Sequence, residues 1–337
     1  MIDLKTRYMG LELKNPIIIG ASNLVTDLSI LKELEKAGAA AIIYKSLFEE
    51  QIQLEELQLD HELEEYNERH AEMSSLFPNL QHAGPEEHLL NLKKVKEQLN
   101  IPVIASLNCI FKETWIEYAK TIEKYGADGL ELNFYSIPKD FETQSLAVES
   151  EQIEIVREVK RNVKIPVSVK LSPFYTSPLH LIKKMDETGI QAFVLFNKLF
   201  QPDFNIDQME LSFPYNLSDS EENRICLRFA GLLFGQINAD ICANTGILSG
   251  KDVIKMILAG ANSVQIVSAI YKNKPPYIFK ILEEIERWMV EKKFTTLDDF
   301  RGKMSKKMIK DPYAYKRAQY VDILMKSDTV FTKYPLR

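Results

Sequence analysis

The chain alternates short apolar runs with longer amphipathic stretches, and this alternation constrains its fold more than any other feature. The apolar runs are nearly continuous and rich in isoleucine and valine, which is typical of parallel strands covered on both faces. They lie at 16–20, 40–44, 102–107, 129–133, 166–171, 191–196, 239–243 and 262–267. Helical periodicity fills the intervals at 29–38, 86–99, 114–126, 149–163, 178–189, 222–236 and 251–260.

Eight such units predict an α/β fold, a (β/α)8 TIM barrel formed by one domain over residues 1–337. An open, doubly wound sheet is the alternative. The eightfold pattern weighs against it, as does the lack of a glycine-rich fingerprint near the N-terminus.

Three segments fall outside the repeating pattern. Residues 1–15 alternate around Met9-Gly10, which predicts a β-hairpin that plugs the lower mouth of the barrel. Residues 49–80 form an acidic insertion after the second strand, either a solvated helical excursion or a lid over the catalytic face. Residues 303–337 form a basic, tyrosine-containing extension that predicts one more helix docked outside.

Composition narrows the class of protein. The chain has 42 Lys+Arg against 48 Asp+Glu, and its net charge of −6 argues against nucleic-acid binding. No apolar run approaches the roughly 20 residues that span a bilayer, and the N-terminus lacks an apolar signal region, so we expect a cytoplasmic enzyme without membrane contact. Three widely spaced cysteines, Cys109, Cys226 and Cys242, predict neither a disulfide framework nor a metal site.

Functional side chains of a barrel cluster after the carboxyl ends of its strands. These positions supply three lysines with amides and hydroxyls, but no histidine and no pair of carboxylates. They hold Ala21, Ser22, Asn23, Lys45, Ser46, Asn108, Asn133, Ser136, Lys170, Asn197, Lys198, Asn244, Thr245, Gly246 and Ser268. These positions therefore lack the residues that metal hydrolysis, glycoside hydrolysis and Ser-His-Asp catalysis require. The set suits an anionic ligand, with phosphate bound by the last two loops.

Several segments, in order, resemble the flavin-dependent dihydroorotate dehydrogenase family, and its soluble class 1 members in particular, over nearly the whole chain. They are NPIIIGAS at 15–22, YKS at 44–46, LELNFYSIP at 130–138, PVSVKLSP at 166–173, LFNK at 195–198, and TGILSGKDVIKMILAGANSVQIVSAIY at 245–271. The resemblance implies an FMN-dependent oxidoreductase of pyrimidine biosynthesis. It would oxidise (S)-dihydroorotate, or a similar dihydropyrimidine, at a CH–CH bond.

The same resemblance implies that FMN lies across the top of the barrel. Lys170 would stand near N1 and O2 of the flavin, where a cation stabilises the reduced ring. A lysine at the end of a buried strand also requires a partner. The full set of implied cofactor ligands is Ala21, Ser22, Lys45, Ser46, Asn108, Asn133, Lys170, Asn197, Thr245, Gly246, Val267 and Ser268.

For the substrate, the resemblance implies contacts from Lys45, Asn133, Asn197 and Lys198. Lys45 and Ser136 would be catalytic, with Ser136 at the position of the family's base, which is cysteine in class 1 relatives and serine in class 2. A general base typically contributes about 10²–10⁴ in rate.

The chain departs from the family at several of these positions. Thr245-Gly246 and Val267-Ser268 stand where the family has a glycine pair and Gly-Thr. Two asparagines that contact substrate in the family are missing, because Ile137-Pro138 and Met73 or Ser74 stand in their places. Lys198 replaces a small hydroxyl residue and favours a more anionic ligand.

Partners and rival functions follow from the same residues. The chain shows no iron–sulfur ligation, so electrons would pass to a soluble acceptor or a separate redox protein, and the family implies a homodimer. One alternative is an FMN oxidoreductase with a different CH–CH substrate. The others are a Schiff-base lyase using Lys170 or Lys45, and a catalytically inert paralogue.

Overall fold

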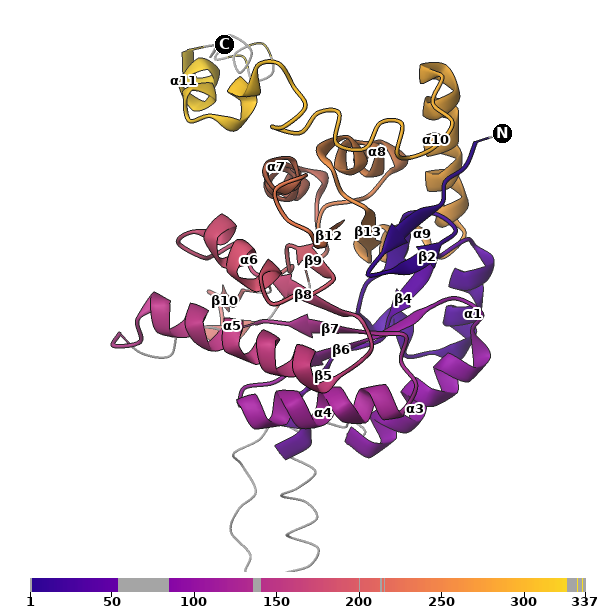
Figure 1. Ribbon diagram of the computed structural model, residues 1–337, viewed down its shortest axis with the longest axis vertical. Helices are drawn as coiled ribbons and strands as arrows, with labels where there is room; N and C mark the ends of the chain where they lie inside the picture. The colour runs from indigo at the N-terminus through magenta and orange to yellow at the C-terminus, as the bar shows by residue number, and fades with distance from the viewer. Residues whose placement is uncertain are drawn as a thin grey trace, which may run out of the picture.

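The structure is a computed structural model that describes residues 2–53, 85–135, 141–199, 201–212, 214, 216–325, 332 and 335. Within these residues, eight parallel strands form a closed barrel surrounded by helices (Figure 1). The strands are β3 (Ile17–Ile19), β4 (Ala41–Ile43), β6 (Val103–Asn108), β7 (Gly129–Asn133), β8 (Val167–Leu171), β9 (Ala192–Leu195), β12 (Asp240–Ala243) and β13 (Ser263–Ile266). The ring closes because β13 pairs with β3 and β4 pairs with β6. The (β/α)8 prediction is confirmed, and the open sheet is excluded.

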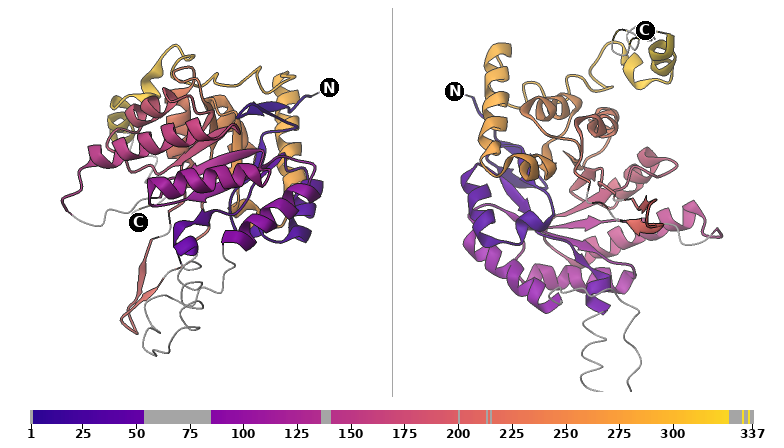
Figure 2. Two further views of the ribbon diagram at one scale, coloured as in Figure 1. Left: turned by 60° about the horizontal axis from the view of Figure 1, so that its bottom comes forward. Right: turned by 180° about the vertical axis from the view of Figure 1, so that it is seen from behind.

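Helices connect the strands and cover the outside of the barrel (Figure 2). They are α1 (Leu28–Lys36), α3 (Pro85–Gln98), α4 (Lys112–Lys124), α5 (Ser145–Asn162), α6 (Pro178–Asp186), α7 (Asn223–Leu233), α8 (Gly250–Ala259), α9 (Ser268–Asn273) and α10 (Tyr277–Lys292). In α1, the buried side chains are Leu31 and Leu34, one turn apart on one face. No helix in the described ranges is long and apolar enough to cross a bilayer.

The N-terminal hairpin closes one end of the barrel, as predicted. Strands β1 (Thr6–Tyr8) and β2 (Leu11–Leu13) pair antiparallel around Met9 and Gly10, whose φ values of 55° and 81° suit a two-residue hairpin turn. Tyr8, Met9 and Leu13 pack in one cluster with side chains inside the barrel, among them Ile18, Ile104 and Val194. The lower mouth is therefore filled, and any ligand must enter from the opposite face.

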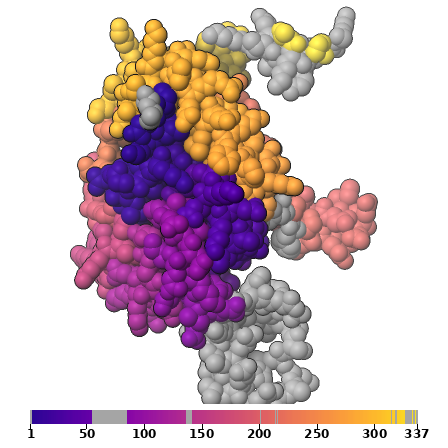
Figure 3. Space-filling view, turned by 90° about the vertical axis from the view of Figure 1, so that its right-hand side faces the viewer, coloured from indigo at the N-terminus to yellow at the C-terminus, as the bar shows by residue number. Residues whose placement is uncertain are grey.

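Two elements lie outside the barrel. A hairpin that the sequence pattern did not predict follows β9. It is formed by β10 (Asp203–Asn205) and β11 (Glu210–Ser212), and it projects from the body in Figure 3. The C-terminal extension includes helix α11 (Ala318–Met325), and Arg228 of α7 donates to Gln319 at 3.2 Å. Most of the acidic insertion, residues 54–80, lies outside the described residues, so its role stays a prediction.

Glu49 fixes the chain just beyond β6, the strand that ends at the predicted cofactor-binding residue Asn108. This carboxylate is 2% exposed and accepts hydrogen bonds from the backbone N–H groups of Ile110 and Phe111 and from the Thr114 hydroxyl. It thereby fixes the two residues that precede α4, of which Phe111 is the N-cap, and joins them to Thr114 in the first turn of the helix.

We expect Glu49→Ala to lower the free energy of unfolding by about 2–3 kcal/mol, because three partly buried donors lose their charged acceptor. The exposed neighbour Glu50 offers a control that removes the same charge, and Glu50→Ala should cost less than about 0.5 kcal/mol. Urea unfolding of the two variants measures the difference. Equal costs would show that Glu49 does not fix the start of α4 in solution.

Candidate functional site

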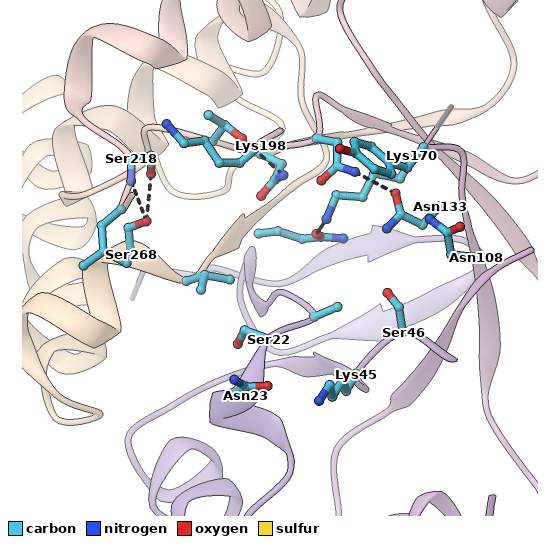
Figure 4. Close-up of a pocket in the computed structure, with 18 of the residues that line it drawn as sticks. Ser22, Asn23, Lys45, Ser46, Asn108, Asn133, Lys170, Lys198, Ser218 and Ser268 are labelled. Carbon is cyan, nitrogen blue, oxygen red and sulfur yellow. Dashed lines mark hydrogen bonds between the residues drawn. The ribbon is translucent and has the colours of Figure 1, made fainter. Parts of the chain in front are cut away.

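A cavity of about 350 Å³ opens at the carboxyl ends of the strands (Figure 4). The structure brings together there every described residue to which the sequence analysis gave a role. These are Ala21, Ser22, Lys45, Ser46, Asn108, Asn133, Lys170, Asn197, Lys198, Thr245, Gly246, Val267 and Ser268. The cavity volume lies in the range of cofactor and small-molecule sites.

The residues that line the cavity are not identical with the predicted set. Ser136, Ile137, Pro138, Met73 and Ser74 lie outside the described residues. Conversely, several lining residues had been given no role: Asn23, Phe48, Tyr135, Asn216, Leu217, Ser218, Asn244, Ile247 and Gln265. Asn23 and Asn244 were detectable as strand-end amides. Gln265 and Ser218 gave no local signal.

Lys170 has the buried partners that its position requires. Its ammonium donates to Gln265 Oε1 at 3.3 Å and lies 3.7 Å from Glu131 Oε1. Gln265 Nε2 donates to Glu131 Oε2 at 2.6 Å, which fixes the orientation of the Gln265 amide. The Glu131 side chain is fully buried and the Lys170 side chain is 7% exposed. The Lys170 cation, on β8, is thus held at the floor of the cavity by side chains from two other strands, β7 and β13.

Two asparagines form a pair on the same face. Asn197 Nδ2 donates to Asn133 Oδ1 at 2.8 Å, which leaves the Asn197 oxygen and the Asn133 amino group for a ligand. Asn108 Nδ2 is buried, and among the described residues it has no hydrogen-bond partner. An unpaired buried donor costs free energy unless a ligand supplies an acceptor. The donor set therefore fits a flat ligand rich in carbonyl and imide groups, such as a flavin ring.

Lys45 follows β4 and lies near a buried histidine. His88 of α3 packs its ring 5.1 Å from the ring of Tyr44. Burial, and to a smaller extent the nearby charge of Lys45, lower the pKa of His88 to about 4. The imidazole is therefore neutral at neutral pH, so it adds no charge beside the Lys45 ammonium.

The turns after β12 and β13 border the other end of the cavity. Thr245 and Gly246 both have positive φ, 73° and 72°, and the Thr245 hydroxyl donates to the Phe196 carbonyl at 2.9 Å. Val267 has a φ of −136°, a value open to any residue, so its backbone does not need the family's glycine. Ser268 Oγ accepts the Ser218 N–H at 2.9 Å.

The three cysteines lie elsewhere. Cys109, Cys226 and Cys242 are buried and unpaired, and none of them lines the cavity. Burial raises the pKa of Cys226 to about 12, and it raises the pKa of Cys109 and Cys242 as well. These thiols stay protonated and are not placed to act as a base in the cavity.

Comparison with known proteins agrees with this geometry. The family model for dihydroorotate dehydrogenase matches residues 3–289. The curated relatives that match include catalytic subunits of dihydroorotate dehydrogenase B (NAD(+)), of which three are described here. The one from Methanocaldococcus jannaschii is 28% identical over 303 residues, which covers 87% of this chain and 95% of that protein. The one from Thermoplasma volcanium is 29% identical over 309 residues, covering 90% and 98%.

The third, from Methanothermobacter thermautotrophicus, is 26% identical over 310 residues and covers 89% of this chain and 97% of that protein. The family match, the closed barrel and the ring of lysine and amide side chains at the strand ends all agree. The chain therefore belongs to the dihydroorotate dehydrogenase family of flavin-dependent oxidoreductases, as its motifs predicted.

Proposed function

We propose that this chain binds FMN across the carboxyl-terminal face of its barrel and oxidises (S)-dihydroorotate or a closely similar dihydropyrimidine. The observation that carries the proposal is the buried Lys170 ammonium, held by Glu131 and Gln265 in the same cavity as the Asn133–Asn197 pair. When bound, the flavin supplies the hydride acceptor. Lys170 provides fixed positive charge where the reduced ring carries negative charge.

The two ends of the cavity suit the two ends of FMN. Asn108 lies near Asn133 and Lys170 in Figure 4, and together with Ala21, Ser22 and Ser46 it would border the ring. The turns at 245–246 and 267–268 line the far part and offer backbone N–H groups to the phosphate. The substitutions to Thr245 and Val267 retain these donors.

Lys45, Asn133 and Asn197 would hold the substrate. An asparagine side chain can donate a hydrogen bond to a carbonyl and accept one from an N–H group, and the Lys45 ammonium attracts a carboxylate. Within the described residues, no carboxylate forms a salt bridge with Lys45, which leaves its charge for a ligand. We propose Ser136 as the group that removes the substrate's proton and Lys45 as the second catalytic residue.

The acceptor of the electrons follows from the relatives. Those named above are catalytic subunits of NAD(+)-dependent enzymes, which supports a separate redox subunit as the partner of this chain. We further propose that it works as a cytoplasmic homodimer, the arrangement that the family resemblance implies.

The test is to purify the full chain, release and identify its cofactor, and add (S)-dihydroorotate without oxygen. We expect FMN and bleaching of its absorbance. Ser136→Ala and Lys45→Met should slow the bleaching by about 10²–10⁴, whereas Lys183→Met, at an exposed site on α6, should not change it.

Three outcomes would contradict the proposal. Bleaching by a compound that is not a dihydropyrimidine, with none by dihydroorotate, would contradict the proposed substrate. A colourless protein that cannot take up FMN would contradict the proposed cofactor. Borohydride trapping of Lys45 or Lys170 with a carbonyl compound would favour the lyase instead.

A further inference from the structure

The ammonium of Lys198 lies away from the end of the cavity that holds Lys170. Figure 4 shows the Lys198 side chain extending toward Ser218, whereas Lys170 lies near Asn133. Lys198 Nζ forms an ion pair of 2.6 Å with Glu222 Oε2. Glu222 in turn accepts the Asp219 N–H at 2.9 Å, which ties the ion pair to the segment that carries Ser218.

From this geometry we infer that Lys198 binds the phosphate group of FMN, and not the substrate as its place after Asn197 suggested. The inference rests on the proposed function and assigns one residue of that site. It makes Lys198 the side chain that distinguishes the phosphorylated flavin from the unphosphorylated one.

The surrounding groups suit a phosphate oxygen. The hydroxyls of Ser218 and Ser268 lie 2.9 Å apart, and both residues line the cavity at this end. The other ammonium nearby, on Lys272, donates to the Ser218 carbonyl at 2.9 Å and lies 3.4 Å from Asp219, but Lys272 does not line the cavity. In the part of the chain that is described, Lys198 is thus the cation that faces this end of the cavity.

The charge balance also favours a dianion here. Without a ligand, Glu222 neutralises Lys198, so the pair adds no net charge. A phosphate monoester carries about −1.5 to −2 at pH 7. An ammonium has three N–H donors, so Lys198 can keep its bond to Glu222 and donate another to a phosphate oxygen. Glu222 positions the ammonium and at the same time repels the phosphate.

FMN and riboflavin differ only in the phosphate, and their affinities therefore test the assignment. We expect Lys198→Met to weaken FMN binding by the apoprotein about 10–100-fold and to leave riboflavin binding unchanged, because it removes one charge-assisted hydrogen bond. Lys198→Arg should keep most of the preference for FMN. Glu222→Gln should tighten FMN binding and leave riboflavin binding unchanged.

Flavin fluorescence titration of the full-length apoprotein measures these constants, with circular dichroism as the check that each variant is folded. An equal loss for both ligands, or no loss for FMN, would overturn the role of Lys198 and leave the proposed function intact. Failure of the unmodified chain to bind FMN would instead overturn the proposed function, and this assignment with it.

Discussion

Lys170→Met is expected to lower the free energy of unfolding by about 3–5 kcal/mol, because it leaves the Glu131 carboxylate buried without its cation. It should also slow reduction of the bound flavin by substrate about 10²–10³-fold, the usual effect of removing one preorganised charge from a reacting site. Denaturant unfolding measures the first effect, and anaerobic stopped-flow absorbance measures the second.

A second substitution separates these two effects. In Lys170→Met/Glu131→Gln no charge remains at the floor of the cavity, and the glutamine can still accept from Gln265 Nε2. We expect this double variant to regain most of the lost stability while flavin reduction stays slow. Ser263→Ala is the control, since it alters a fully buried side chain on the same strand as Gln265 without removing a charge, and it should cost less than about 1 kcal/mol.

Two results would contradict this account of the buried charges. If the double variant were no more stable than Lys170→Met, the unpaired carboxylate would not be the source of the loss. If Lys170→Met reduced its flavin at the normal rate, the fixed cation would not act on the reaction.

The barrel was predictable because its signals are local. Each strand is a short apolar run, and each helix repeats its apolar positions every three or four residues. Met9-Gly10 predicted the hairpin, since two residues of positive φ join antiparallel strands with the right twist. Parallel strands also have their carboxyl ends on one face, which is why strand-end residues as distant as Ser22 and Ser268 were expected in one cavity.

The side-chain contacts that the sequence did not reveal depend on strand register and on pairs of residues far apart in the chain. Glu131 stands two residues before Asn133, so the strand pleat puts both inside the barrel, and a charged residue in a buried run was the available signal. Its bond to Gln265 joins residues 134 positions apart, which no local pattern encodes. The partner of Lys198, Glu222, lies 24 residues later in the same long connection between β9 and α7, so sequence adjacency to Asn197 suggested the substrate instead.

The missed hairpin has a different cause. Strands β10 and β11 lie in the loop after β9, and their side chains Phe204 and Leu211 are 69% and 62% exposed. The expected strands were those of a buried parallel sheet, which read as continuous apolar runs. A short antiparallel pair that stands out from the body does not produce that pattern.

Gly246→Ala should be the most damaging single-methyl change in the turns around the cavity. Gly246 has a φ of +72°, and an added Cβ would lie 2.6 Å from both the backbone nitrogen of Asn223 and the backbone oxygen of Asp219. These atoms belong to the start of α7 and the segment before it, so backbone must move. We expect a loss of about 2–5 kcal/mol, from the left-handed conformation and from overpacking together.

Gly126→Ala isolates the conformational part of that loss. Gly126 has a φ of +90°, and a Cβ there would meet nothing within 4 Å, so the change should cost about 1–2 kcal/mol. Movement of Asp219 and Asn223 would also displace Ser218 and Glu222. We therefore expect Gly246→Ala to weaken FMN binding by more than tenfold, and Gly126→Ala to leave it unchanged. Thermal unfolding and flavin titration of both variants measure these differences. Equal stability and equal FMN affinity would mean that the turn at Gly246 yields to a side chain, and that the phosphate end of the cavity is not held by this close backbone contact.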